Sequence, residues 1–171
     1  TGGGGLATIQ FARAAGLQVI ATGGSDSGRQ LARAHGAHHV LDHHADAHWQ
    51  QVLDLTDGRG VDVIVEMLAN VNLGRDLAVL ARGGRIAIVG SRGPVEINPR
   101  DAMAREADIL GVMLWRMTPD EYRETHAALQ AGLARGVLRP VVGAKLPLHQ
   151  AAAAHERVLQ AGSNGKIVLT P

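Results

Sequence analysis

Two kinds of segment alternate along this chain, and the alternation limits the fold more than any other feature. Short apolar runs rich in β-branched residues predict strands at 18–22, 39–42, 61–66, 85–89, 109–114 and 166–170. Helix-length segments lie between them, most ending at a glycine: 6–15, 27–35, 45–56, 72–81, 118–135 and 148–160. The strands are almost continuously apolar, which is typical of parallel strands buried on both faces. We therefore predict an α/β fold with a doubly wound parallel sheet and right-handed crossovers.

Composition excludes several classes of function. The 171 residues suffice for one domain with its own core. A balance of 17 basic against 16 acidic residues, with 2% aromatics, argues against a nucleic-acid partner. The absence of cysteine excludes a disulfide scaffold or a thiolate zinc site in this chain and permits a cytoplasmic location. No apolar run approaches the roughly 20 residues of a membrane-spanning helix, so no membrane partner is expected.

The glycine run at the start of the chain is a candidate phosphate-binding loop. Thr1, Gly2, Gly3, Gly4 and Gly5 lead directly into a helical pattern, whose N-terminal N–H groups favour an anion such as a pyrophosphate. In a Rossmann-like dinucleotide-binding fold a strand precedes this loop. We therefore expect residues 1–171 to be the dinucleotide-binding domain of a larger subunit, lacking its first strand and an upstream lobe. By spacing alone, a flexible chain end explains the glycines equally well.

The segment after the strand at 18–22 bears on which dinucleotide would bind. Folds that prefer NAD place an acid at this strand end to bind the ribose 2′-hydroxyl. Here Thr22 is followed by Gly23, Gly24 and Ser25, and Asp26 comes late enough to cap the next helix. With Arg29 and His43 nearby, this uncharged pocket favours the 2′-phosphate of NADPH over NADH.

A second group of candidate residues follows the strands at 61–66 and 85–89. Ligands bind beyond the carboxyl ends of parallel strands, where Arg92 either holds a phosphate or an interface carboxylate or is simply solvated. Glu66 ends an apolar strand, and a buried carboxylate there needs a partner; it is a candidate for orienting the loop. Asn70 and Asn72 either contact a cofactor or cap the next helix.

The histidines do not predict a metal site. Six of them fall within fourteen positions, and His44 and His48 have the i, i+4 spacing of metal ligands. No HExxH motif surrounds the pair, so we expect surface histidines and no metal. No G-x-S-x-G motif of a serine hydrolase is present.

Specific strings along the chain resemble a known family. They are VEMLANVNL at 65–73, GGRI at 83–86, VGSRG at 89–93 and EINPRD at 96–101. These strings, and a likeness that continues to GKIVL at 165–169, are similar to the zeta-crystallin-like NADPH:quinone oxidoreductases. Those enzymes form a zinc-free branch of the medium-chain dehydrogenase/reductase family, and their full subunit has an upstream GroES-like catalytic lobe that this chain lacks.

The resemblance implies a set of cofactor-binding residues and no catalytic acid or base in this chain. The family's phosphate loop corresponds to residues 1–5, although the family usually has valine where Gly4 stands. Gly24 would lie against the adenosine ribose, His43 near the 2′-phosphate, and Asn72 in the loop after the fourth strand, facing the cofactor. The nicotinamide half would be lined by Val89, Gly90, Ser91 and Arg92 and flanked by Val112, Met113 and Leu114.

The resemblance also implies a homodimer formed through the strand read at Ile109–Leu114. A long apolar edge strand is an aggregation hazard unless covered, and an isologous dimer covers it. The implied activity is reduction of a quinone with NADPH, by hydride or electron transfer from the nicotinamide, and the isolated chain is expected to be inactive. Reduction of an enoyl thioester is an alternative within the family, and a non-catalytic nucleotide- or RNA-binding or crystallin-type structural role is an alternative outside it.

Overall fold

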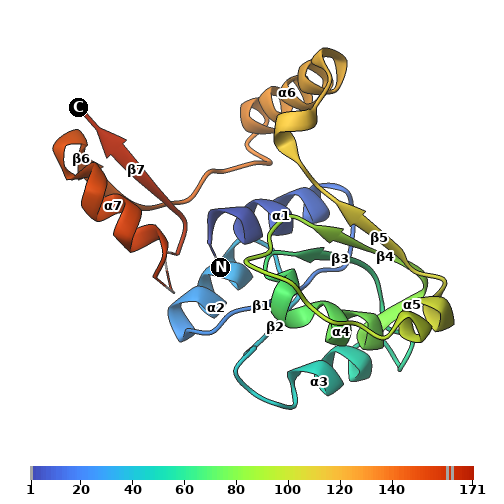
Figure 1. The fold of residues 1–171 in the computed structure, drawn as a ribbon. Coiled ribbons are helices and arrows are strands. Elements are labelled where there is room, and N and C mark those ends of the chain that lie inside the picture. The colour runs from blue at the N-terminus through green and yellow to red at the C-terminus, as the bar shows by residue number, and fades with distance from the viewer. Residues whose placement is uncertain (1, 161, 163) are drawn as a thin grey trace. The chain divides into compact units, whose positions relative to one another are not determined.

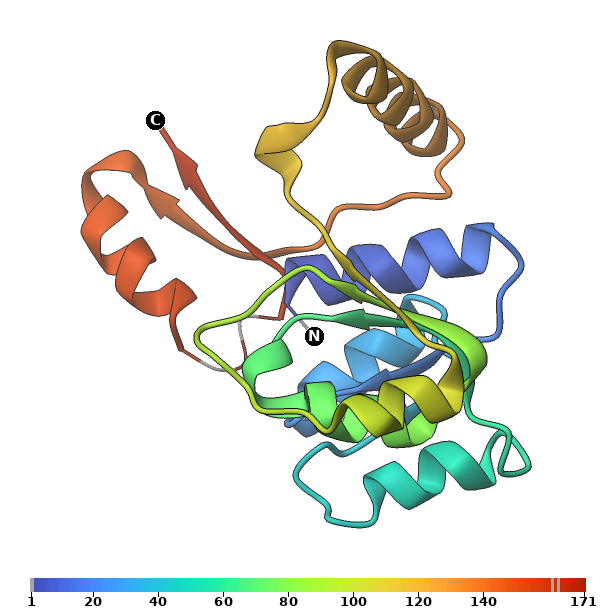
Figure 2. The same cartoon turned by 45° about the vertical axis from the view of Figure 1, so that its right-hand side comes forward.

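The computed structural model describes residues 2–160, 162 and 164–171, so Thr1 of the candidate phosphate loop lies outside the described residues. The chain divides into two compact units. The first unit comprises residues 1–45 and 123–171, and the second comprises residues 46–122. Figure 1 and Figure 2 show the elements of both, coloured along the chain.

The first unit contains two pairs of parallel strands. Helix α1 (Gly3–Ala14), β1 (Ile20–Thr22), α2 (Asp26–Ala34) and β2 (His39–Leu41) follow one another, and β1 pairs with β2. The C-terminal part contains most of α6 (Pro119–Ala134), β6 (Val142–Pro147), the 3-10 turn η2 (Leu148–Gln150), α7 (Ala151–Val158) and β7 (Lys166–Thr170). There β6 pairs with β7.

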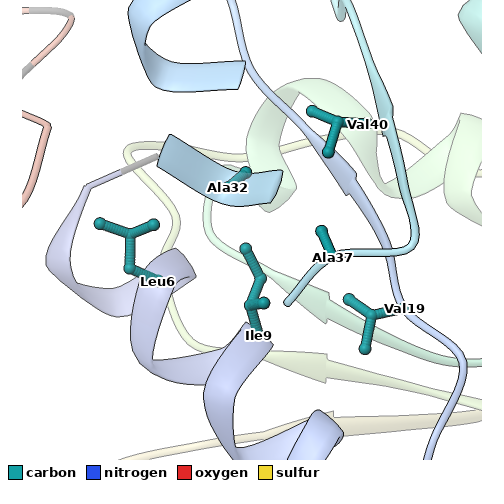
Figure 3. Close-up of a cluster of buried hydrophobic side chains, with 6 residues drawn as sticks. All are labelled: Leu6, Ile9, Val19, Ala32, Ala37 and Val40. Atoms are coloured by element: carbon teal, nitrogen blue, oxygen red, sulfur yellow. The ribbon is translucent and has the colours of Figure 1, made fainter. Parts of the chain in front are cut away.

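The core of the first unit lies between α1, α2 and the β1–β2 pair. Figure 3 shows its buried side chains, which come from these elements and from the segments just before β1 and β2: Leu6, Ile9, Val19, Ala32, Ala37 and Val40. A buried glutamine ties the C-terminal part to α1. The Gln10 amide donates to the Arg139 carbonyl (3.0 Å), and its oxygen accepts the Arg139 N–H (2.6 Å). One side chain thus satisfies both backbone groups of Arg139.

The second unit is a three-stranded parallel sheet in the order β3-β4-β5. Its elements are α3 (His48–Asp54), β3 (Val61–Glu66), α4 (Ala69–Val79), β4 (Leu80–Ile88), α5 (Pro99–Arg105), β5 (Asp108–Gly111) and the 3-10 turn η1 (Leu114–Arg116). Helices α4 and α5 cover one face of the sheet (Figure 1). Their shared core is built on Leu73, Leu77, Leu80 and Ile86.

The predicted parallel α/β architecture is confirmed, and every strand pair among the described residues is parallel. Among the described residues the strands form three sheets, and no strand pairs with both β1 and β3. Burial on both faces is wrong for β3, because Val63 and Val65 are 48% and 37% exposed.

Several predicted boundaries shift for identifiable reasons. The helix predicted to stop at the Gly83-Gly84 pair ends at Val79, and those glycines lie inside β4, with Gly83 at φ +72°. The strand predicted at Ile109–Leu114 ends at Gly111. Its partner β4 has ended at Ile88, so only the Val112 N–H still reaches the sheet, donating to the Ile88 carbonyl (2.9 Å).

Two elements were missed. Strand β6 has the sequence VGAKLP, whose glycine, lysine and proline hide the apolar pattern of a strand. Helix α5 carried a readable start, because Asn98 caps the Arg100 N–H (3.1 Å) and Pro99 occupies the first helical position. The capping box predicted at Thr118 and Glu121 is confirmed by reciprocal bonds of 2.7–3.2 Å.

Candidate functional site

The N-terminus of α1 has the features of an anion site. Gly2 is its extended N-cap, Gly3 to Gly5 form its first turn, and no acidic residue lies in that turn. The side chain of Lys166 packs directly on Gly3: a Cβ atom there would lie 2.7 Å from its Cδ and Cε atoms. A cation beside the positive end of a helix is unfavourable unless an anion is also present. Such an anion would meet backbone N–H groups and an ammonium group together.

Lys166 was missed by the sequence analysis. It stands at the start of β7, where its backbone N–H donates to the Val141 carbonyl (2.7 Å), and the segment was interpreted only as a strand. The only sequence signal was a charged residue, directly after Gly165, at the head of an apolar run. Its proximity to Gly3, 163 positions away, comes from the tertiary structure alone.

The structure brings Gly24 and His43 together, as the prediction requires. Both follow the carboxyl ends of paired strands, β1 and β2, which end in register at Thr22 and Leu41. A Cβ on Gly24 would lie 2.7 Å from His43 Nε2 and 2.5 Å from His44 Nε2. The two imidazole rings lie edge to face with their centroids 4.6 Å apart. Gly24 is therefore the floor of an imidazole-lined surface, and His44 is a neighbour that the sequence analysis did not select.

Arg29, which was expected near the 2′-phosphate, is already engaged. Its guanidinium pairs with Asp26, contacts Asp42 (2.8 Å) and donates to the Gly23 carbonyl (3.1 Å). The His44 backbone N–H bonded to Asp42 lowers the pKa of that carboxyl, and the charge of Arg29 lowers it further. Arg29 thus organises the two carboxylates, and the side chains that approach Gly24 are the imidazoles of His43 and His44.

The remaining predicted residues follow the carboxyl ends of the strands in the second unit's sheet. Glu66, Ile88 and Gly111 lie in register at the carboxyl ends of β3, β4 and β5. Val89, Gly90, Ser91 and Arg92 follow β4, while Val112, Met113 and Leu114 follow β5 and are 42–66% exposed. The predicted nicotinamide-side residues therefore belong to adjacent loops of this edge. Val112, Met113 and Leu114 lie beyond the strand to which they were assigned.

The segment that follows β3, including the first turn of α4, interlocks with the loop after β4. The Ala69 N–H donates to the Gly90 carbonyl (3.0 Å), and Asn70 Oδ1 accepts the Arg92 N–H (2.9 Å). A Cβ on Gly90 would lie 2.5 Å from the Met67 carbonyl oxygen, so only glycine fits there. Asn70 thus fixes the backbone of Arg92, whose exposed side chain has no ion-pair partner among the described residues.

Asn72 has a different position from the predicted one. It lies within α4 rather than in a loop, and its amide donates to both oxygens of Glu66 (3.3 Å each). Glu66 is buried, as its position predicted, and it also accepts the Leu68 N–H. Asn72 therefore satisfies the buried carboxylate. Glu66 is confirmed as a residue that orients the loop.

A second buried carboxyl group faces Glu66 and was not singled out from the sequence. Asp76 is 2% exposed and stands one helical turn after Asn72 on α4. Burial, followed by the charge of Glu66 and a hydrogen bond to it, raises the pKa of Asp76 to about 7. The sequence signal was the i, i+4 spacing from Asn72 on the apolar face of the helix.

The histidines do not gather into a metal site. In the described part of the chain no group of three or more His, Asp or Glu side chains is placed to hold a metal ion. His38 has a structural role: its Nδ1 atom accepts the Val19 N–H (2.9 Å), and its Nε2 atom contacts Arg13. Independence from zinc stays a prediction.

A hollow in the second unit is not lined by the predicted site residues. It is a cavity of about 370 Å³ between α3 and α4, lined by residues that include Trp49 and Arg75.

No helix of the described residues has the length and apolar character to cross a membrane.

Parallel strands, loops clustered at their carboxyl ends and a glycine-started helix define a Rossmann-like α/β domain. Residues 3–131 match the family described as zinc-binding dehydrogenase, and the chain belongs to that family.

Individual relatives agree with this assignment. Human quinone oxidoreductase is 45% identical over 170 residues, covering 99% of this chain and 52% of the relative, and the Lama guanicoe quinone oxidoreductase is 48% identical with the same coverage. The solved structure of Escherichia coli quinone oxidoreductase complexed with NADPH superposes with a TM-score of 0.86 at 26% identity. It covers 99% of this chain and 54% of that one. The resemblance seen in the sequence is thereby confirmed for quinone oxidoreductases. The chain spans about half the length of the curated relatives it matches.

Proposed function

We propose that residues 1–171 are one dinucleotide-binding domain, the NADPH-binding part of a quinone oxidoreductase. The supporting observation is the glycine-started N-terminus of α1 with Lys166 packed on Gly3, because this arrangement of positive groups calls for an anion. The similarity to quinone oxidoreductases over 99% of the chain supports the choice of activity over enoyl-thioester reduction or a structural role. When bound, NADPH supplies the reducing equivalent.

In this proposal the first unit holds the phosphates and the adenosine. The backbone N–H groups of Gly2 to Gly5 bind the pyrophosphate, and Lys166 neutralises it. Gly24 lets the ribose approach the backbone, and His43 faces the 2′-phosphate. The absence of an acid between Thr22 and Ser25 supports NADPH over NADH, since a carboxylate there would repel that phosphate.

The second unit lines the nicotinamide in this proposal. Val89, Gly90 and Ser91 present the loop after β4, Arg92 supplies an exposed cation, and Val112 to Leu114 supply apolar surface. Asn72 acts indirectly in this proposal, because its amide donates to Glu66 rather than to the cofactor. None of these side chains is an acid–base catalyst, so their work is to bind and orient the cofactor and to exclude water.

We also propose that the protein is a homodimer built on β5. This strand is at the edge of its sheet, and Ile109 and Leu110 are 37% and 46% exposed. An apolar edge that is left uncovered would promote aggregation. Light scattering at high micromolar concentration should report a dimer, and a monomer would contradict the proposal. A cytoplasmic location, permitted by the absence of cysteine, is part of the same proposal.

The test of the cofactor proposal is calorimetric titration of this chain with NADPH and, separately, with NADH. We expect tighter binding of NADPH. Lys166→Ala should weaken both cofactors several-fold, because both carry the pyrophosphate. Lys145→Ala is the matched control, since Lys145 is an exposed lysine of the neighbouring strand β6. Absence of binding by the unchanged chain, or equal effects of the two lysine substitutions, would contradict the proposal.

A further inference from the structure

Glu66 and Asp76 form a pair of buried carboxyl groups beside the loops of the proposed nicotinamide side. Both residues are almost fully buried, at 6% and 2% exposure. Two neighbouring carboxylates in such a site cannot both carry a charge without a large cost. Asp76 Oδ2 is buried with no hydrogen-bond partner among the described residues. A proton on Asp76 removes the repulsion and provides a donor toward Glu66.

Glu66 in turn holds the loop that contacts the proposed nicotinamide side. Its carboxylate accepts the Leu68 N–H and the Asn72 amide. Its backbone carbonyl accepts the N–H groups of Val89 (2.8 Å) and Gly90 (3.2 Å). A single residue at the end of β3 therefore anchors both loops of the interlocked pair.

We propose that Asp76 is a positioning residue for cofactor binding. As the proton-bearing member of the buried pair, it keeps the Glu66 carboxylate in place beneath the loop that carries Asn70 and, through it, the backbone of Arg92. This inference rests on the proposed binding of NADPH and adds a pH dependence to it. Loss of the proton puts two charges into the pair, pushes Glu66 away and loosens the loop.

Groups on the elements packed against α4 do not offset that charge. These elements are β3, β4, α3 and α5. Glu66 of β3 is the charged group that acts on Asp76. Arg105 of α5 instead donates to the Ala78 carbonyl (2.8 Å), and Arg82 of β4 pairs with Glu106 (2.6 Å). His48 of α3 is a further titratable side chain on these elements, and it is buried. The remaining charged side chains on α4 and on the elements packed against it are exposed: Asp54, Asp62, Arg75, Arg85, Arg100 and Asp101.

The deciding measurement is the dissociation constant of NADPH between pH 5.5 and 8.5 for the unchanged chain and for Asp76→Asn. The amide of the variant donates to Glu66 at every pH. We expect binding to the unchanged chain to weaken several-fold more across this range than binding to the variant. The 2′-phosphate of NADPH also titrates in this range, but it is common to both experiments, so the difference between the two proteins belongs to the pair.

Two further variants sharpen the result. Glu66→Gln places the amide on the other side of the pair and should also flatten the pH profile. Asp54→Asn removes one exposed carboxylate from the same unit and should leave the profile unchanged. Equal pH profiles for the unchanged chain and Asp76→Asn, both folded and binding NADPH, would overturn the proposal.

A readout without cofactor separates this inference from the proposed function. The Leu68 amide proton is bonded to Glu66, so its NMR shift should titrate near neutral pH in the unchanged chain and not in Asp76→Asn. If the chain bound no NADPH but Leu68 titrated in this way, the proposed function would fail while the carboxyl pair stood. If Leu68 showed the same shift profile in both proteins, the inference itself would fail.

Discussion

The molecule contains two clusters of charged groups beside its proposed cofactor residues, and they are built on opposite principles. In the first unit, the positively charged Arg29 pairs with the two negatively charged side chains of Asp26 and Asp42. In the second unit, Glu66 and Asp76 have the same charge when ionised and are buried. The surface cluster lowers the pKa of Asp42, and the buried pair raises the pKa of Asp76.

The difference shows how solvent decides the worth of an ionisable group. The side chains of the two acids paired with Arg29 are 88% and 38% exposed, so water screens these ion pairs and each contributes little to folding. Water does not screen the buried pair, so the folded chain keeps a proton on Asp76 to avoid two adjacent charges. The surface cluster is engaged in its own ion pairs, whereas the buried pair couples the loops above it to pH.

The largest expected effect is on the pH dependence of stability. Because burial and Glu66 raise the pKa of Asp76 from 3.8 to about 7, the folded chain holds a proton that the unfolded chain has released. The free energy of unfolding therefore falls as the pH rises from about 4 to 7 and levels off above. Asp76→Asn should remove this fall, worth at most about 4 kcal/mol. Urea denaturation at several pH values measures it.

Asp42 gives the opposite sign and serves as the comparison. Its pKa is lowered, so its contribution to stability is present above its ordinary pKa and is lost as the pH falls. Asp42→Asn should therefore differ from the unchanged chain by an amount that shrinks only in acid. If both variants showed the same pH window, the contrast between the clusters would be wrong.

A truncation compares the two clusters at one pH. Glu66→Ala leaves the Leu68 N–H and the Asn72 amide without their acceptor, and it should cost about 2–4 kcal/mol of the free energy of unfolding. Asp42→Ala should cost much less, because the Asp42 side chain is 38% exposed and water screens its ion pair with Arg29. Chemical denaturation at pH 7 measures both. Equal losses would show that burial does not distinguish the clusters.

A smaller effect is expected when an exposed cation is removed from the second unit. Arg92→Ala should weaken NADPH binding by about 1–3 kcal/mol if its guanidinium makes a charge-assisted hydrogen bond to the cofactor. Stability should barely change, because this side chain is exposed. Calorimetry with Arg100→Ala, an exposed arginine on α5, as the control measures the effect. Unchanged affinity would make Arg92 a solvated loop residue.

The smallest effect is expected at the imidazole beside Gly24. His43→Ala should weaken NADPH by about 1 kcal/mol or less, since the site is exposed, and should weaken NADH by less still. The ratio of the two dissociation constants is the measurement, with His149→Ala as a matched surface control. Equal losses of the two cofactors would remove His43 from the 2′-phosphate site.

Local patterns predicted most of the elements and several of the candidate residues. Helix α6 was readable from its capping box at Thr118, and β3 from its run of β-branched residues, because both signals act over a few residues. The i, i+4 contacts of α4 are equally local. The strand β6 was not readable, because its stability comes from pairing with β7 rather than from its own residues.

Long-range geometry decided the rest of the site. Lys166 contacts Gly3 from the other end of the chain, and Arg29 is held by Asp42 rather than exposed to a ligand. Asn72 serves Glu66 instead of pointing outward from a loop. No spacing rule connects such residues, since each contact depends on how strands and helices pack.

The sequence by itself determined the parallel α/β class, the two groups of loop residues and the resemblance to quinone reductases, because these depend on periodicity and on short strings. The tertiary structure alone decided which charges are buried and which are exposed. A carboxyl group acquires its pKa from the atoms around it, and at Asp76 the decisive ones belong to Glu66 on another element. That is why the buried pair was visible only once the helix α4 lay on the strand β3.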